Sequence, residues 1–223
     1  MKVAALCSGG KDGIYALWLS MKDGHEISEI VVMDPETPNS WMFHKPQPIL
    51  IDLFQEAYGI PVKRVRTAGR KGEELEDLKQ GLTTLAIEGI VSGAVASNYQ
   101  RDRIGKICED LALSSILPLW KREQEEMLRD MIENNFKIII TSVAAEGFKK
   151  EWIGKKIDQN SLQDLMKLRS KKDIHIMGEG GEYESLVLDA PFFKKEIKIE
   201  DSKSHWEKDR GWLEIKKAYL TKK

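Results

Sequence analysis

The residues best suited to chemistry form a short, glycine-containing run near the start of the chain. This SGGKD run, residues 8–12, follows an apolar stretch and precedes a helical pattern that begins at Ile14. Two adjacent glycines allow a sharp turn that presents backbone N–H groups, and the N-terminus of the following helix adds positive potential. Lys11 adds a mobile positive charge. The run therefore predicts a phosphate-binding turn, and the alternative is an ordinary surface turn.

The SGGKD run resembles the SGGKDS signature of the PP-loop, which marks the N-type ATP pyrophosphatases, enzymes that split ATP between the α and β phosphates. The P-loop pattern G-x-x-x-x-G-K-[ST] occurs nowhere in the chain. The resemblance implies phosphate contacts from four residues, Ser8, Gly9, Gly10 and Lys11. Asp12 is expected to orient the loop or to approach Mg²⁺.

Gly13 departs from this signature, which has Ser or Thr at that position. The change removes a hydroxyl donor to phosphate and costs about 1 kcal/mol in helix propensity. We expect ATP affinity or rate to be lower than is usual for the family, and ATP binding to survive through the neighbouring backbone N–H groups, with that of Gly13 among them.

Composition limits the classes of partner. The 223 residues include 35 basic and 36 acidic side chains, so the formal charge of −1 creates no overall field that would attract nucleic acid or an anionic membrane. Two cysteines are too few for a disulfide framework or a metal cluster, and the first residues lack a secretory pattern, which favours the cytoplasm. No apolar stretch approaches the ~20 residues that span a bilayer. We expect neither a membrane nor direct nucleic-acid binding.

Strand-like and helical segments alternate over the first 120 residues. Five apolar runs are expected to form strands: residues 3–7, 27–33, 61–65, 90–96 and 116–117. Helical crossovers require parallel neighbours, so the pattern predicts an α/β fold with a doubly wound, mainly parallel sheet. Ligands of such sheets bind beyond the carboxyl ends of the strands, so residues 8–12, 33–34 and 97–103 should converge on one crevice.

After residue 120 the alternation stops, and we divide the chain into an ATP-binding domain, residues 1–120, and a smaller α+β domain, residues 121–223. The second domain contains the string GEGGEYE, residues 178–184, directly before an apolar strand pattern. Carboxylates packed so densely repel one another, and folding alone does not explain that cost. The string predicts a recognition loop for a cation, either Mg²⁺ or a cationic substrate. The alternative is an exposed hairpin loop.

Taken together, four motifs look like the diphthine–ammonia ligase family, also called diphthamide synthase: SGGKD, SNYQRDR at 97–103, PLW at 118–120 and GEGGEYE. The pairing of the first with the last is specific to that family. The resemblance implies a PP-loop fold of the adenine nucleotide alpha hydrolase-like kind and an ATP-dependent amidation. The substrate would be diphthine, a trimethylammonium-bearing modified histidine of a translation elongation factor. Its carboxylate would be adenylated with release of pyrophosphate, and ammonia would then displace AMP.

The resemblance also assigns residues outside the glycine run. Met33, at a strand end, is expected to flank adenine. Arg101 and Arg103 are expected to reach phosphate or the substrate carboxylate, because a planar guanidinium matches both, and the alternative is a solvated helix surface. Eight residues are candidates for substrate recognition: His44, Trp120, Glu179, Gly180, Gly181, Glu182, Tyr183 and Glu184.

A trimethylammonium group cannot donate a hydrogen bond, so carboxylate fields and aromatic faces are expected to hold it. Tyr183 and Trp120 would supply the faces, with ordinary packing as the alternative for both, and a structural role is the alternative for His44. Two other functions stay open. One is another adenylating PP-loop enzyme, such as a tRNA-modifying one, although the chain lacks the cysteine pairs typical of these. The other is a non-catalytic ATP-binding module. Whether the protein forms a homo-oligomer is also left open.

Overall fold

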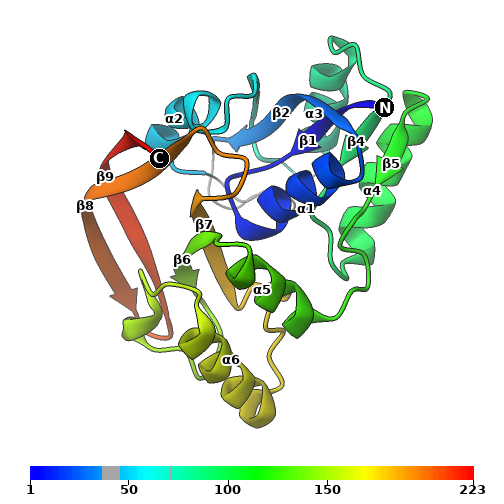
Figure 1. Ribbon diagram of the computed structural model, residues 1–223. Coiled ribbons are helices and arrows are strands. Elements are labelled where there is room, and N and C mark those ends of the chain that lie inside the picture. Colours follow the sequence, from blue (N-terminus) through cyan, green and yellow to red (C-terminus); the bar gives the residue numbers. More distant parts are fainter. Residues whose placement is uncertain (37–45, 71) are drawn as a thin grey trace. The chain divides into compact units, whose positions relative to one another are not determined.

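The computed structural model describes residues 1–36, 46–70 and 72–223 and divides them into two compact units, Met1–Trp120 and Lys121–Lys223 (Figure 1). Each unit contains one sheet, of five strands in the first and four in the second. In the described residues, no helix has both the length and the apolar character needed to cross a bilayer.

The first unit is built on a parallel sheet with the strand order β3-β2-β1-β4-β5. Its strands are β1 (Lys2–Leu6), β2 (Glu26–Pro35), β3 (Val62–Thr67), β4 (Gly89–Val91) and β5 (Ser114–Ile116). Its helices are α1 (Lys11–Lys22), α2 (Pro48–Tyr58), α3 (Glu73–Thr83) and α4 (Asn98–Asp110). The predicted doubly wound parallel sheet is therefore confirmed. The chain order reverses between β1 and β4, and this is the switch point at which such sheets bind ligands.

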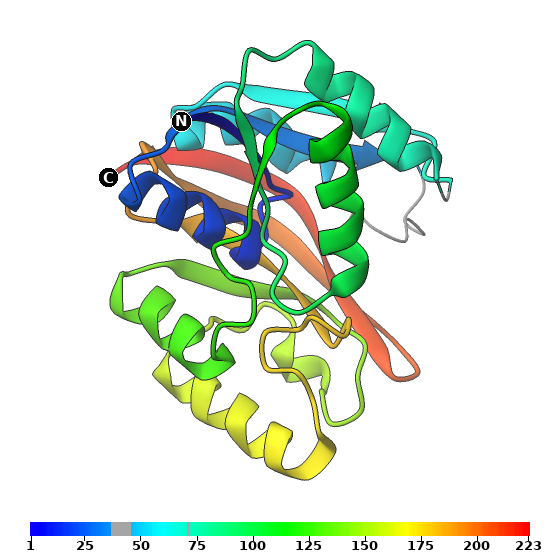
Figure 2. The same cartoon turned by 90° about the vertical axis from the view of Figure 1, so that its right-hand side faces the viewer.

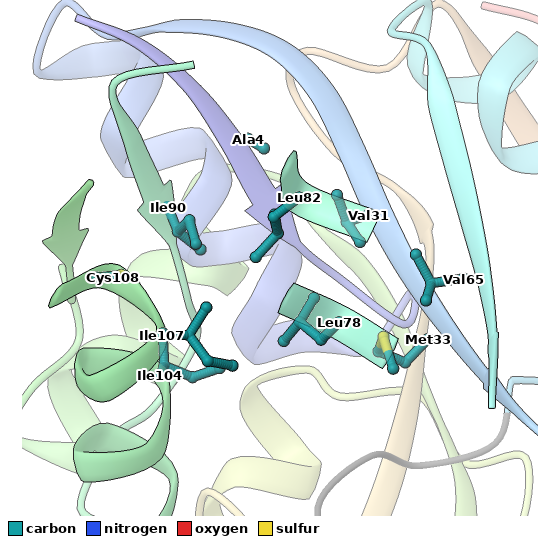
Figure 3. Packing of buried hydrophobic residues seen from close by; sticks show 10 residues of the cluster. All are labelled: Ala4, Val31, Met33, Val65, Leu78, Leu82, Ile90, Ile104, Ile107 and Cys108. Atoms are coloured by element: carbon teal, nitrogen blue, oxygen red, sulfur yellow. The ribbon is translucent and has the colours of Figure 1, made fainter. Parts of the chain in front are cut away.

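Side chains that alternate along the strands form the core on one face of this sheet. Val31 and Met33 on β2 point to the same face, because side chains two residues apart lie on one side of a strand. There they pack against α3 and α4, in a cluster of ten buried residues (Figure 3): Ala4, Val31, Met33, Val65, Leu78, Leu82, Ile90, Ile104, Ile107 and Cys108. Right-handed crossovers place α1 and α2 on the opposite face.

One strand is shorter than the sequence predicts. The apolar run 90–96 suggests a strand throughout, but β4 ends at Val91 and residues 92–97 form a loop. Ala94 and Val95 are nevertheless buried, which explains why the sequence pattern resembles a strand. The loop lies at the switch point, directly after the strand that neighbours β1.

The second unit is an antiparallel sheet with helices, as expected for an α+β domain. The strand order is β7-β6-β9-β8. Its strands are β6 (Lys137–Val143), β7 (Tyr183–Asp189), β8 (Lys195–Glu207) and β9 (Arg210–Lys222), of which β8 and β9 form a long hairpin (Figure 2). Its helices are α5 (Gln124–Glu133), the short 3-10 helix η1 (Lys150–Trp152) and α6 (Gln159–Lys172). Asp158 and Ser161 form a reciprocal capping box at the start of α6.

Candidate functional site

The glycine turn, residues 7–10, joins β1 to α1 and holds Gly9 in a conformation that favours glycine. Gly9 has a φ of +88°, in the region that L side chains rarely adopt, and a Cβ there would lie 2.5 Å from Phe54 Cζ. Gly10 is the N-cap of α1, and no side chain forms a capping hydrogen bond there. The N-terminus of α1 therefore keeps the positive potential and the outward N–H groups that bind anions.

Lys11 is more enclosed than the sequence suggests. It is only 2% exposed, and its Nζ lies 2.9 Å from Asp12 Oδ2. The expectation of a mobile charge is therefore wrong, because the side chain is buried and paired with Asp12. A buried ammonium group requires an anionic partner, and Asp12 is one. The site thus holds its positive charge in a fixed position beside the turn.

Cys7 lies beneath the glycine turn and acts as a packing residue. Its Sγ accepts a hydrogen bond from the Gly9 N–H at 3.4 Å, and burial raises the pKa of the thiol to about 12. The stacked rings of Phe54 and Tyr58, with centroids 5.1 Å apart, belong to α2, and Phe54 supports Gly9 from that helix. A thiol with so high a pKa is a poor nucleophile at neutral pH, so Cys7 does not suit a sulfur-transfer reaction.

Gly13 faces the end of β1 at close range. A Cβ on Gly13 would lie 3.1 Å from Cys7 Sγ and 3.2 Å from both Cys7 Cα and Leu6 O. These distances are tighter than most real Cβ contacts, so a larger residue would require its neighbours to move by a few tenths of an ångström. The absence of the Ser or Thr found in the PP-loop signature therefore coincides with a close helix–strand contact.

Both arginines of α4 are held against aromatic rings. Arg101 Cζ lies 4.7 Å from the centre of the Trp120 ring, and its Nη2 pairs with Asp102 Oδ1 at 2.7 Å. Arg103 Cζ lies 3.4 Å from the centre of the Tyr99 ring. One face of the Trp120 ring is therefore occupied by the guanidinium of Arg101.

The side chain of Met33, near the end of β2, lies in the core. Met33 is 4% exposed and belongs to the core beneath α3 and α4 (Figure 3). The next residue, Asp34, is also buried; its Oδ2 accepts a hydrogen bond from Arg64 Nε at 2.8 Å and forms an ion pair with Nη2 of the same guanidinium at 2.7 Å. Any contact of Met33 with adenine therefore involves its main chain. The candidate His44 lies outside the described residues.

In the second unit, Glu182 closes the acidic loop, residues 173–182, between α6 and β7. Its Oε1 accepts the His175 N–H at 2.7 Å and its Oε2 accepts the Gly180 N–H at 2.8 Å. Gly178 and Gly181 have φ values of +75° and +83°, and a Cβ on Gly178 would lie 2.7 Å from Tyr183 O. The glycines thus allow a tight loop, and the central carboxylate forms its internal hydrogen bonds.

Tyr183 belongs to the core of the second unit. It is 3% exposed, its OH donates to Ile176 O at 2.7 Å, and its ring centroid lies 6.0 Å from that of Phe148. The candidates of the GEGGEYE string therefore differ in what they can reach. Glu182 and Tyr183 form internal contacts, whereas Glu184 is exposed and Glu179 is half-buried. Gly180 and Gly181 are also exposed.

Two supporting residues were not singled out by the sequence. Phe54 contacts Gly9 from α2, and Gly93 follows β4 and contacts the first turn of α1. Phe54 has the periodicity of any buried helix residue, and Gly93 lies inside an apolar run. Neither carries a local signal, because the importance of each comes from a neighbour distant in sequence. In the described residues, no group of three or more His, Cys, Asp or Glu side chains could hold a metal ion.

Comparison with known proteins gives matches along nearly the whole chain. The Diphthamide synthase N-terminal domain family matches residues 1–115, and the Diphthamide synthase C-terminal domain family matches residues 123–221. A protein named diphthine–ammonia ligase from Mus musculus is 37% identical over 227 residues, which cover 92% of this chain and 85% of that protein. The Homo sapiens protein of that name is 37% identical over 225 residues, or 91% and 84%.

The match extends to more distant relatives. The Danio rerio diphthine–ammonia ligase is 32% identical and aligns with 100% of this chain and 95% of its own length. A crystal structure described as a predicted subunit of tRNA methyltransferase from Methanocaldococcus jannaschii covers 88% of this chain and 99% of its own, at 17% identity and a TM-score of 0.45, a likeness too distant to bear on function. The matches to both halves of the chain confirm the resemblance drawn from its motifs: this chain belongs to the diphthamide synthase family.

Proposed function

We propose that this protein is an ATP-dependent ligase that converts the carboxylate of diphthine, carried on a translation elongation factor, into the amide of diphthamide. Ammonia is the nitrogen donor. Membership of the family over both units supports this proposal, as do the names of the relatives. The structural observation that carries it is the uncapped glycine turn at the switch point of a parallel sheet, with the buried charge of Lys11 beside it.

The chemistry requires activation of the carboxylate, because oxide is too poor a leaving group for ammonia to displace. A carboxylate oxygen attacks the α phosphorus of ATP, the bond to the bridging oxygen breaks, and its electron pair leaves with pyrophosphate. Ammonia then attacks the acyl carbon and loses a proton, and AMP departs as the amide forms. The protein must position the two reactants and neutralise the charge that moves onto pyrophosphate.

The residues of the first unit suit that task. The Gly9 and Gly10 turn and the N-terminus of α1 would bind phosphate oxygens, and Lys11 would balance their charge. Arg101 and Arg103 would contact phosphate or the substrate carboxylate. Mg²⁺ would bind chiefly through phosphate oxygens, with Asp12 as the candidate protein carboxylate, since Mg²⁺ at phosphate sites commonly uses one or two carboxylates. That ion would neutralise charge on the departing pyrophosphate.

In the second unit, the acidic loop and the start of β7 would recognise the trimethylammonium group. Glu182 accepts two backbone hydrogen bonds within the loop, whereas Glu184 on β7 is exposed and Glu179 is half-buried. Their negative field attracts a permanent cation without needing a donor on it. Glu182 and Tyr183 would then shape the loop rather than contact the substrate.

The proposal is tested with Lys11→Met, which keeps the buried apolar stem and removes only the charge. Release of AMP and pyrophosphate is measured with ATP, ammonium and the diphthine-bearing elongation factor. We expect a loss of about 10²–10³-fold, as for removal of one preorganised charge donor from a transition state. Lys22→Met, which changes an exposed lysine of the same helix, should behave as the wild type.

Three results would refute the proposal. Formation of ADP instead of AMP would contradict attack at the α phosphorus. ATP binding without turnover would favour a non-catalytic module. Turnover that required tRNA and ignored the elongation factor would favour a tRNA-modifying enzyme.

A further inference from the structure

We propose that Gly93 is a positioning residue for the phosphate-binding turn, and that it acts through direct backbone contact with α1. This inference rests on the proposed function, because it assumes that the N-terminus of α1 holds the phosphates of ATP. Gly93 lies two residues after β4, in the loop at the switch point, and is 80 positions along the chain from Gly13, which it touches in α1.

The contact is between main chains. A Cβ on Gly93 would lie 2.6 Å from Asp12 C, 2.7 Å from Gly13 N and 2.9 Å from Asp12 O. Those three atoms form the peptide group between Asp12 and Gly13, in the first turn of α1. Real Cβ atoms essentially never come that close, so any residue with a side chain at 93 would force this peptide to move. A flexible side chain could rotate away, but a helical peptide moves only with its turn.

Backbone strain does not complicate the role of Gly93. Gly9 has a positive φ and would be strained by any substitution, whereas Gly93 is not among the described glycines with a positive φ. Alanine at position 93 is therefore compatible with the local backbone. Its effect would report the contact with α1 alone.

The same turn of α1 is also fixed from a second side. Gly13 lies against the end of β1, where a Cβ would come within 3.1 Å of Cys7 Sγ and 3.2 Å of Leu6 O. The first turn of α1 is therefore enclosed between the ends of β1 and β4, the two strands that flank the switch point. Close contact on both sides leaves the turn little freedom to adjust its position.

This arrangement sets the position of the N–H groups at the start of α1. Hydrogen bonds weaken steeply with distance and angle, and binding sites need their groups within about 0.5 Å of the productive geometry. Relief of a 2.6 Å contact requires a displacement larger than that, because ordinary van der Waals contact begins at 3.4 Å. A side chain at 93 would therefore weaken binding of the phosphates and spare binding of the nucleoside.

The test compares three glycine-to-alanine variants that form a graded series. Gly93→Ala introduces a backbone clash, and Gly13→Ala introduces a milder contact on the same turn. Gly105→Ala, in α4, places its Cβ where no atom lies within 4 Å. Calorimetry measures binding of ATP, inorganic pyrophosphate and adenosine to each variant, and thermal unfolding monitors the fold.

For Gly93→Ala we expect a loss of affinity of about tenfold or more for ATP and pyrophosphate, the equivalent of one good hydrogen bond, with adenosine affinity unchanged. Gly13→Ala should show the same pattern with a smaller loss, and Gly105→Ala should match the wild type. A merely structural role for Gly93 would lower the affinity for all three ligands together. That outcome, or unchanged affinity for ATP and pyrophosphate, would overturn the inference.

Two further outcomes are decisive. If Gly93→Ala does not fold, Gly13→Ala decides, because it moves the same turn: selective loss of ATP and pyrophosphate binding supports the inference, and wild-type binding overturns it. If the wild type itself binds no pyrophosphate and Lys11→Met leaves ATP affinity unchanged, the phosphate assignment of the proposed function fails, and this inference fails with it. If only the results for Gly93→Ala contradict the inference, the proposed function is unaffected.

Discussion

Glu182→Gln tests whether the central carboxylate of the acidic loop shapes that loop or contacts the substrate directly. In the folded protein this carboxylate accepts the N–H groups of His175 at 2.7 Å and Gly180 at 2.8 Å. Glutamine keeps one oxygen acceptor but presents an NH₂ group to the second N–H. Hydrogen bonds to a charged acceptor contribute about 1.5–3 kcal/mol each. Gly180 is exposed, so water can replace the lost partner there. The closed loop therefore loses about 1.5 kcal/mol of stability.

A loss of that size makes opening of the acidic loop about tenfold more favourable. Amide hydrogen exchange at His175 and Gly180 should therefore accelerate by about tenfold in the variant. The catalytic efficiency for the elongation factor should fall by up to about tenfold, depending on how much of the loop population stays closed. ATP affinity should remain that of the wild type, because both hydrogen bonds are internal to the loop. Glu207→Gln, an exposed change of the same kind in β8, serves as the control.

Two results would refute this reasoning. If exchange at both amides stays at the wild-type rate while use of the elongation factor falls, Glu182 contacts the substrate directly and does not shape the loop. If ATP affinity falls as much as use of the elongation factor, the effect is not confined to the acidic loop.

Two other substitutions test buried residues in or next to the sequence motifs, Tyr183 in the GEGGEYE string and Cys7 beside the glycine turn. Tyr183→Phe leaves the buried carbonyl of Ile176 without its 2.7 Å donor, so urea unfolding should show a loss of about 1–3 kcal/mol, and an unchanged free energy of unfolding would contradict the role of that hydrogen bond. Burial raises the pKa of Cys7 from 9.0 to about 12. The folded state therefore binds this proton more tightly than the unfolded state, and the stability it contributes is complete below pH 9 and disappears as the pH rises to about 12. The free energy of unfolding should fall less steeply over that range in Cys7→Ala than in the wild type, and identical pH dependence in the two proteins would disprove this.

Features with a local cause could be predicted from the sequence. The glycine pair before a helical pattern predicts the turn between β1 and α1, because the conformation of a sharp turn depends mainly on the residues that form it. The alternation of strands and helices predicts the parallel sheet, since helical crossovers determine the direction of each neighbour. The switch point follows from the strand order. The sequence also locates the acidic loop before β7, since the glycines interrupt an otherwise regular pattern.

Features that depend on distant neighbours could not be predicted. Lys11 has the sequence context of an exposed helix residue, yet it is 2% exposed in the folded protein. The side chain of Met33 lies in the core under α3 and α4. The strand pattern shows which residues of β2 share a face, but not which face these helices cover. Trp120 contacts Arg101 across 19 positions of sequence, and the apolar run 90–96 conceals the end of β4 at Val91.

The glycines of this chain mark the places where main chain must approach main chain, and this changes how its phosphate site should be studied. A site built from backbone N–H groups is insensitive to most side-chain substitutions, because the binding groups are present whatever the residue. It is sensitive where a Cβ would enter a backbone contact, as at Gly93, or where the φ itself excludes other residues, as at Gly9. Alanine scanning would miss Ser8 or Gly10 if only their N–H groups bind, and would detect Gly93, which need not touch the ligand. Distance from the nucleotide is therefore a poor guide to which residues control its binding here, and the packing of α1 against β1 and β4 is a better one.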